Sequence, residues 1–271
     1  MSWIRGIDVS QFQGKRIPWL DVKAMGVDFA YMRCHHGNDH GPDPHFAENV
    51  RGARGAGVRI GAYCVAFPLP HLRPIDQVRL WQSSLVVDGN PVGELRGELP
   101  VAIDLEWPPP HEWDKWKCSA DQIVDWTLDC LAAWSNRPIV YSYPHFLNYL
   151  AKAKNAKMLA AYELWIAGGP QYKDGSGVVP NDDARPPKTA IWGDDWTIWQ
   201  HDGDGGARLP HGVDADFNVY NGDADDLAAF CGEIAVSLES DAPPVNSDQT
   251  RSLLLDFELG EYRRRRDCGF G

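Results

Sequence analysis

Two carboxylates stand two residues apart in an otherwise apolar run, Asp104 and Glu106 in VAIDLEW (residues 101–107). Alternate residues of a strand point to the same face, so a strand here places both acids together. Neighbouring carboxylates resist joint ionisation, which raises the pKa of one of them. A protonated carboxyl beside an ionised one is the pairing that glycoside hydrolysis requires. The alternative is a strand end whose acids meet only solvent or a salt bridge.

Other acids follow other predicted strands. Asp8 lies near the end of the first apolar run, and Asp214 and Asp216 come shortly after the last one. In a closed barrel the first and last strands are neighbours, and enzymes of this class keep their chemistry at the mouth formed by the strand ends. Acids from the first, fourth and eighth strands can then converge on one mouth.

The elements that position these acids alternate between short apolar runs and longer helix-like segments. Residues 119–135 form the clearest helix, because Ser119 and Gln122 make a capping box before apolar residues at a 3.6 period. A last helix is predicted from Asp223. Repeated βα units predict an α/β fold with a parallel sheet, and eight strands favour a closed barrel over an open doubly wound sheet. The predicted strands are residues 3–10, 27–34, 58–67, 99–107, 137–143, 162–169, 189–193 and 196–202.

Composition narrows the class of protein. The net charge of −12 argues against a general nucleic-acid binder. No run approaches the roughly 20 apolar residues of a membrane span, and the first residues lack the apolar core of a secretory signal. We therefore expect the protein to start in a cytosol, with its six cysteines as free thiols. Some of the twelve tryptophans are expected to stack on sugars and most to pack in the core.

No metal or cofactor is expected. The segment CHHGNDHGPDPH holds His35, His36, His40 and His45, but it falls in a loop and lacks the H-E-x-x-H pattern of a catalytic zinc site. A calcium loop starting in DGDGG (202–206) would need a glutamate where Val213 stands. A dinucleotide site is disfavoured, since no G-x-G-x-x-G follows the first strand.

Six motifs together resemble the family 25 glycoside hydrolases, the Chalaropsis-type lysozymes that are common as phage endolysins. The resemblance runs from about residue 3 to residue 222 and rests on GIDVSQFQG, GAYCVAFP, AIDLEW, LWIAGG, IWQ and DFNVYNG. It implies an irregular TIM-like (β/α)5(β)3 barrel. It also implies cleavage of the β-1,4 bond between N-acetylmuramic acid and N-acetylglucosamine in bacterial peptidoglycan.

The resemblance assigns candidate catalytic residues. Glu106 matches the family's acid/base glutamate and Asp104 its ionised partner, while Asp8 and Asp216 match two further aspartates. Asp214 is the alternative in the last motif, although Asp216 keeps the rest of that motif in register. The mechanism implied is retention of configuration with help from the substrate's own 2-acetamido group. The rival is an aspartate that acts as a direct nucleophile or as a base for water.

Substrate contacts are also implied by matching positions. Arg33 stands where relatives often have lysine, and Trp113 or Trp116 can wall the groove or pack on the surface. Trp199 lies within a strand and fits the core equally well. The predicted substrate-binding residues are Tyr63, Tyr141, Trp165, Arg33 and Trp199.

Residues 1–237 are predicted to form the catalytic barrel and residues 238–271 a linker and basic tail. The tail can form a short helix before Arg263–Arg266, a run that fits either a solvated end or an anchor to an anionic surface. It can also add wall affinity or mediate self-association. The absence of a signal suggests a phage lysin that waits in the host bacterial cytoplasm and acts on the wall after release. A non-catalytic wall-binding protein on the same barrel is the other class of function.

Overall fold

The computed structural model describes most of the chain before residue 234. The described residues are 3–13, 16–37, 41–69, 71–106, 118–134, 136–169, 180, 184–203 and 208–233. Trp113, Trp116, His40 and the predicted tail from residue 238 lie outside them, as does the predicted domain boundary. No helix of the described chain is long and apolar enough to cross a bilayer.

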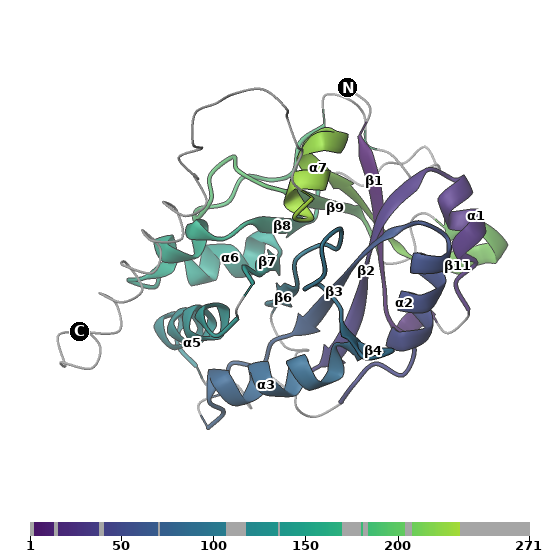
Figure 1. Ribbon diagram of the computed structural model, residues 1–271. Coiled ribbons are helices and arrows are strands. Elements are labelled where there is room, and N and C mark those ends of the chain that lie inside the picture. The colour runs from purple at the N-terminus through teal and green to yellow at the C-terminus, as the bar shows by residue number, and fades with distance from the viewer. Residues whose placement is uncertain are drawn as a thin grey trace, which may run out of the picture. The chain divides into compact units, whose positions relative to one another are not determined.

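Eight strands close into a barrel, in the order β1-β12-β9-β8-β7-β6-β3-β2 (Figure 1). Neighbours pair in parallel except for β12, which runs antiparallel to both β1 and β9. This confirms the predicted α/β barrel. The strands are β1 Ile4–Val9, β2 Val27–His36, β3 Arg59–Val65, β6 Ala102–Asp104, β7 Ile139–Ser142, β8 Leu164–Ala167, β9 Ile198–Asp202 and β12 Asp216–Tyr220.

One predicted strand is wrong, and the eighth strand of the barrel lies in a segment for which no strand was predicted. Residues 189–193 form a turn, closed by hydrogen bonds between Thr189 and Gly193. The segment looks like a strand because it contains the apolar residues Ile191 and Trp192, which are buried in the turn. The Trp192 indole donates to the Tyr162 carbonyl oxygen at 2.8 Å. The eighth strand is β12, whose antiparallel direction brings its first residue to the end of the barrel where the parallel strands finish.

Helices pack around the parallel part of the barrel. The capping box of α5 is confirmed, since the Ser119 hydroxyl accepts from Gln122 N at 3.3 Å and the Gln122 side chain accepts from Ser119 N at 2.9 Å. The last helix starts after Asp223 as predicted, with the Asp223 side chain as its N-cap, and it ends at Phe230, before Gly232 in a left-handed conformation. The α-helices are α1 Trp19–Ala24, α2 Phe46–Gly55, α3 Pro74–Ser84, α5 Ala120–Ala132, α6 Pro144–Leu150 and α7 Ala224–Phe230.

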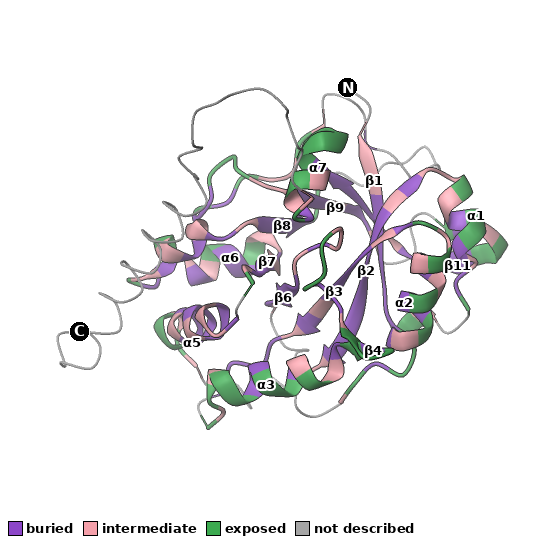
Figure 2. Cartoon of the chain, in the orientation of Figure 1, coloured by how far each residue is buried: buried purple, intermediate pink, exposed green. Residues whose placement is uncertain are grey.

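Short elements complete the fold. In the described part of the chain, three 3-10 helices span Gln11–Gln13, Ala156–Ala161 and Pro210–Gly212. Two small hairpins pair β4 Val86–Val87 with β5 Asn90–Pro91, and β10 Arg208–Leu209 with β11 Val213–Asp214. Figure 2 shows barrel strands that are largely buried and helices such as α2 and α3 that mix buried with exposed residues.

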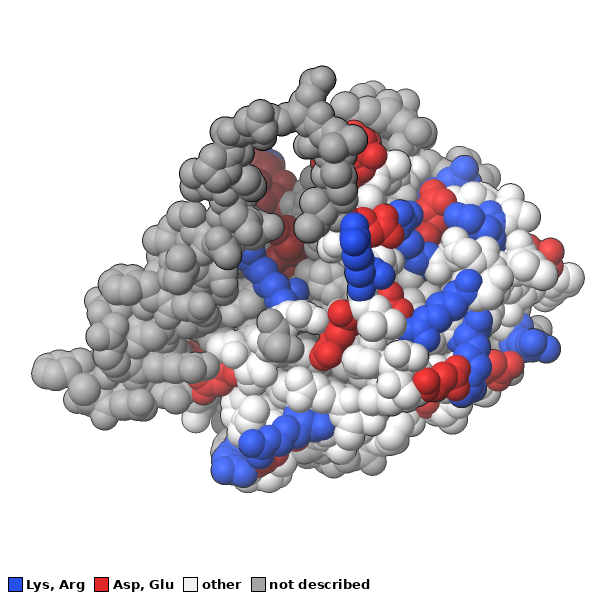
Figure 3. Space-filling model, in the orientation of Figure 1, with Lys and Arg blue, Asp and Glu red and all other residues white. Residues whose placement is uncertain are grey.

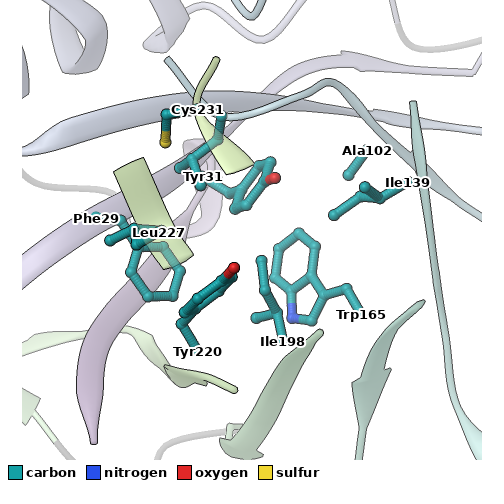
Figure 4. Close-up of a cluster of buried hydrophobic side chains, with 10 residues drawn as sticks. Phe29, Tyr31, Ala102, Ile139, Trp165, Ile198, Tyr220, Leu227 and Cys231 are labelled. Atoms are coloured by element: carbon teal, nitrogen blue, oxygen red, sulfur yellow. The ribbon is translucent and has the colours of Figure 1, made fainter. Parts of the chain in front are cut away.

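Aromatic rings fill the part of the barrel next to α7. Figure 4 shows Tyr31, Tyr220 and Trp165 gathered together, with Leu227 of α7 beside them. Glycines make room for these rings, because a Cβ on Gly6 would lie 2.2 Å from the Phe29 ring. The barrel is therefore a packed core rather than a pore, and a ligand is expected at the end where the parallel strands finish.

Candidate active site

Strand alternation brings the predicted acids to one end of the barrel. Ala102 and Tyr220 belong to the core inside the barrel, so Asp104 and Asp216, two and four positions away along their strands, face the same interior. Asp8 lies directly opposite Asp216 in the β1–β12 register. Because β12 is antiparallel, Asp216 opens its strand at the level where Asp8 and Asp104 approach the ends of theirs.

Asp8 is held by a network from the opposite strands. Asn218 Nδ2 and Gln200 Nε2 each donate to Asp8 Oδ2 at 2.8 Å. The Trp165 indole donates to Asn218 Oδ1 at 2.8 Å, and the Tyr141 hydroxyl donates to Gln200 Oε1 at 2.8 Å. An indole can only donate, so it fixes which side of the Asn218 amide faces Asp8. The aspartate is locked in one orientation.

The charge on Asp8 is unfavourable despite these bonds. Burial raises the pKa of Asp8 well above its ordinary value, and the Asp216 charge raises it further. The hydrogen bonds from Asn218 and Gln200 act in the opposite direction and stabilise the ionised form. Together these acids hold at least one proton more readily than isolated aspartates do.

Asp104 is buried to a similar degree but is held differently. Its backbone is fixed, since the Asp104 carbonyl oxygen accepts from Ala66 N at 2.8 Å. Its carboxylate oxygen Oδ1 is buried and accepts no hydrogen bond from the described residues. Burial raises the pKa of Asp104 well above its ordinary value, followed by the charges of Glu106 and Asp8, while Arg33 lowers it. Burial and the neighbouring acids therefore oppose the charge that the predicted ionised partner carries, and Arg33 favours that charge.

Glu106 is half-buried and follows β6 toward the mouth. The preceding residue is tied down on both sides, because Leu105 N donates to the Tyr141 carbonyl oxygen at 3.0 Å and Leu105 O accepts from Ser142 Oγ at 2.7 Å. The charge of Glu106 acts on Asp104 and Asp8, which places its carboxylate in the same acidic cluster. This is the arrangement that the period of the VAIDLEW run predicted.

The two aspartates of the last motif are separated by the structure. Asp214 is exposed in β11 and forms an ion pair with Arg208, Nε to Oδ1 at 3.1 Å. Asp216 is half-buried opposite Asp8 and raises its pKa. Position in the fold thus favours Asp216 over Asp214 as the acid of the mouth.

Tyr63 and Tyr141 line the interior beside the acids. Each ring meets Trp165 edge to face, with centroids 6.2 Å away for Tyr63 and 4.7 Å away for Tyr141. Both are half-buried, and burial raises the pKa of both hydroxyls well above the ordinary value. They remain neutral donors at the base of the mouth.

Three residues predicted to contact the substrate are buried, and their contacts stay predictions. Arg33 is only 4% exposed, because its guanidinium is paired with Asp43, with Nε 3.0 Å from Oδ2. Trp165 is 1% exposed and forms the floor beneath the acids. Trp199 is fully buried on the outer face of β9, where its indole donates to the Gly168 carbonyl oxygen. None of the three offers a free surface to a ligand.

Sequence reasoning gave no role to Gln200, Asn218 and Asp43. Gln200 and Asn218 lie two residues from Ile198 and Tyr220, which face the barrel interior, so strand alternation could have indicated that they face inward as well. Asp43 stands in a loop, where no period applies. Among the described residues, no group of three His, Cys, Asp or Glu side chains is arranged to hold a metal ion.

A closed barrel with four carboxylates gathered at the strand ends defines a site for acid-catalysed hydrolysis of the glycoside-hydrolase type. Comparison with known proteins gives the family. The model for glycosyl hydrolases family 25 matches residues 7–208, and the chain belongs to this family. The protein is therefore a glycoside hydrolase.

Relatives are similar over most of their length. Lysozyme M1 of Streptomyces globisporus is 28% identical over 239 residues, which cover 86% of this chain and 73% of the relative. An uncharacterized protein of Escherichia coli K12, YegX, is 28% identical over 236 residues, covering 84% and 73%. The crystal structure of the bacterial lysozyme from Streptomyces coelicolor matches with a TM-score of 0.68 at 27% identity, over 87% of this chain and 100% of that one.

Proposed function

We propose that the protein is an N-acetylmuramidase, which cleaves the β-1,4 bond between N-acetylmuramic acid and N-acetylglucosamine in peptidoglycan. The observation that carries this is the pair at the end of β6, a buried Asp104 with an unpaired Oδ1 and a half-buried Glu106 just beyond the strand. Two of the similar proteins are lysozymes by name. On the face drawn in Figure 3, acidic and basic residues are interspersed, which suits a polymer with no strong single-sign charge.

In this mechanism Glu106 is the proton donor. It protonates the glycosidic oxygen as the bond to the anomeric carbon breaks, so that the leaving sugar departs as an alcohol. The crowded acids favour a proton shared among them, since burial and mutual repulsion raise the pKa of Asp8 and of Asp104. Glu106 supplies that proton from the position nearest the open end of β6.

Asp104 would act on the acetamido group of the bound sugar. Its buried Oδ1 lacks a donor, and the acetamido N–H supplies one. The acetamido oxygen then attacks the anomeric carbon and forms an oxazolinium ring, while Asp104 stabilises the positive N–H. Water opens the ring, Glu106 takes the proton of that water, and configuration is retained. Asp8 and Asp216 hold sugar hydroxyls and keep the acid cluster in place.

A wall-clearing assay with product analysis tests the proposal. Wild-type protein should clear a suspension of bacterial walls, and mass spectrometry after borohydride reduction should show reduced N-acetylmuramic acid at the new ends. Reduced N-acetylglucosamine, or freed peptides, would reject the muramidase. The Glu106→Gln variant should sediment with walls without clearing them. If wild-type protein also binds and does not clear, the alternative of a wall-binding protein gains support.

We further propose that the protein is a phage endolysin, held in the host bacterial cytoplasm until a separate pore releases it for cytolysis. The five cysteines of the described chain are all free thiols, as in proteins of a reducing compartment. Expression inside bacteria should leave the culture intact until a pore-forming protein is expressed with it. Lysis without the pore would contradict this arrangement.

Self-association through residues 238–271 stays a prediction. Sedimentation velocity of the full chain tests it, since a concentration-dependent increase in mass is expected if the tail associates. A single monomeric species over a hundredfold range of concentration would remove the idea.

A further inference from the structure

An aromatic side chain stands in the open at the rim of the acidic mouth. Phe12 is 77% exposed and lies in the 3-10 helix Gln11–Gln13, directly after β1. It follows Asp8 by four residues, so it belongs to the same end of the barrel as the acids. Single exposed apolar residues are common on protein surfaces, and exposure alone assigns no role.

Phe12 differs from other exposed apolar residues because a buried arginine packs against its ring. The guanidinium carbon of Arg33 lies 4.7 Å from the centre of the Phe12 ring, in cation–π geometry. Arg33 is itself buried against Asp43, so a fixed cation covers one face of the ring. The opposite face is open to solvent.

The backbone under the ring is fixed by the same ion pair. Asp43 Oδ2, which accepts from Arg33 Nε, also accepts from Gln11 N at 2.8 Å. Phe12 N donates to Ser10 Oγ at 3.2 Å. Asp43 therefore connects the loop that carries Phe12 to the cation beneath it, and the ring is oriented before any ligand arrives.

This support reaches the acidic cluster. Arg33 follows Tyr31 of the barrel core by two positions on β2, and its charge lowers the pKa of Asp104 and of Tyr63. The Phe12 ring thus stands on the β1–β2 side of the mouth, while Asp104 ends β6 and Glu106 follows it. A glycan that places one bond over the β6 acids extends over the rim, where an open aromatic face can meet the next ring.

We propose that Phe12 is a stacking platform for a neutral N-acetylated sugar ring beside the cleaved bond, and that Asp43 is the positioning residue that holds it. The flat C–H face of a pyranose matches an aromatic face, and a pre-oriented ring loses little freedom on binding. The inference rests on the proposed function in one respect, since it takes the substrate to be a glycan chain.

Calorimetry with the N-acetylglucosamine pentamer tests the platform without cleavage, on a Glu106→Gln background. Phe12→Ala should weaken binding about tenfold, or about 1.4 kcal/mol, and Phe12→Trp should keep it. The matched control is Leu20→Ala, since Leu20 is 75% exposed on α1. It should change nothing. Equal affinity for Phe12→Ala and its parent, or equal losses for Phe12→Ala and Leu20→Ala, would overturn the proposal, as would a parent that binds no pentamer at millimolar concentration.

A double-mutant cycle tests the role of Asp43. Asp43→Asn should weaken pentamer binding severalfold in the Phe12 background and much less when residue 12 is already alanine, because both act through one ring. Independent, additive effects would mean that Asp43 supports only the fold. Thermal melts check that each variant is folded. If digestion gives other sugar ends, the muramidase proposal fails, yet these affinities still decide the role of Phe12.

Discussion

The two sides of the mouth each hold a buried aspartate, but the two carboxylates differ in their hydrogen bonds. On the β1 side, Asp8 is buried and receives two hydrogen bonds on Oδ2, from Asn218 and Gln200. On the β6 side, Asp104 is buried with an Oδ1 that no described residue contacts through a hydrogen bond. Burial is the leading cause of the raised pKa in both aspartates. Hydrogen bonds offset it at Asp8, whereas at Asp104 the offset comes from the charge of Arg33.

The difference separates a fixed support from a reactive position. A buried acceptor without a donor weakens the folded state, and such groups persist where a ligand supplies the missing partner. On the β1 side, protein donors already satisfy Asp8 Oδ2. On the β6 side, Asp104 Oδ1 lacks a donor that a substrate can supply, so we infer that the chemistry takes place there.

The largest effect is expected from Glu106→Gln. Glutamine keeps the shape of the side chain but cannot donate the proton, so kcat should fall by about 10²–10⁴-fold, the usual worth of general acid catalysis. Rates of wall clearing at saturating substrate measure it. Binding to walls should be unchanged, and a variant that still clears walls at a tenth of the wild-type rate would remove Glu106 from its role.

Asp104→Asn should reduce kcat by roughly 10²-fold, in line with the loss of one electrostatic contact to the transition state. It should also stabilise the protein at neutral pH, by roughly 2–6 °C in melting temperature. The pKa of Asp104 is raised on folding, so wild-type stability falls as pH rises above about 4. Asparagine does not ionise and avoids that loss.

Melting curves against pH check the sign of this effect. The gain from Asp104→Asn should be present at pH 7 and disappear below about pH 4, where the aspartate is protonated in both folded and unfolded chains. If Asp104→Asn melts below wild type at pH 7, the charge of Asp104 does not destabilise the folded protein.

The opposite sign is expected on the β1 side. Asn218→Leu leaves the Trp165 indole without its acceptor and removes one donor from Asp8. Each lost partner of a buried group costs about 1–3 kcal/mol, so the melting temperature should fall by several degrees. Activity should drop about tenfold through misplacement of the acids. Calorimetric melts and clearing rates measure both, and an unchanged melting temperature would mean that the network adds no stability.

The smallest effect on activity is expected from Trp199→Phe. Trp199 lies on the outer face of β9, and the change removes a hydrogen bond to Gly168 worth about 0.5–1.5 kcal/mol. The melting temperature should fall slightly while KM for wall fragments stays the same. A several-fold rise in KM would support Trp199 as a substrate contact.

The sequence predicted much of this fold because local patterns agree with it. Short apolar runs located seven of the eight barrel strands, and the Ser119–Gln122 box marked the start of α5. It failed at residues 189–193, where Trp192 is buried in a turn, since burial alone does not distinguish a strand from a packed loop. The antiparallel direction of β12 depends on barrel closure and has no local signal.

The acidic residues of the site could be predicted from the sequence, but the residues that hold them in place could not. Asp104 and Glu106 share a face through a spacing that one strand contains. Gln200 and Asn218 gain their role only when β9 and β12 are brought beside β1. The ion pair of Arg33 with Asp43 could not be predicted, because Asp43 stands in a loop without a periodic pattern.

The most direct test of the account is proton NMR of a fresh digest of peptidoglycan, recorded before the new ends can equilibrate. If Asp104 assists the acetamido group and Glu106 donates the proton, the first signal should be the β-anomer of reducing N-acetylmuramic acid, and the α-anomer should follow by slow mutarotation. An α-anomer that appears first would mean that water attacks the sugar directly. That result would contradict the role assigned here to the unpaired oxygen of Asp104.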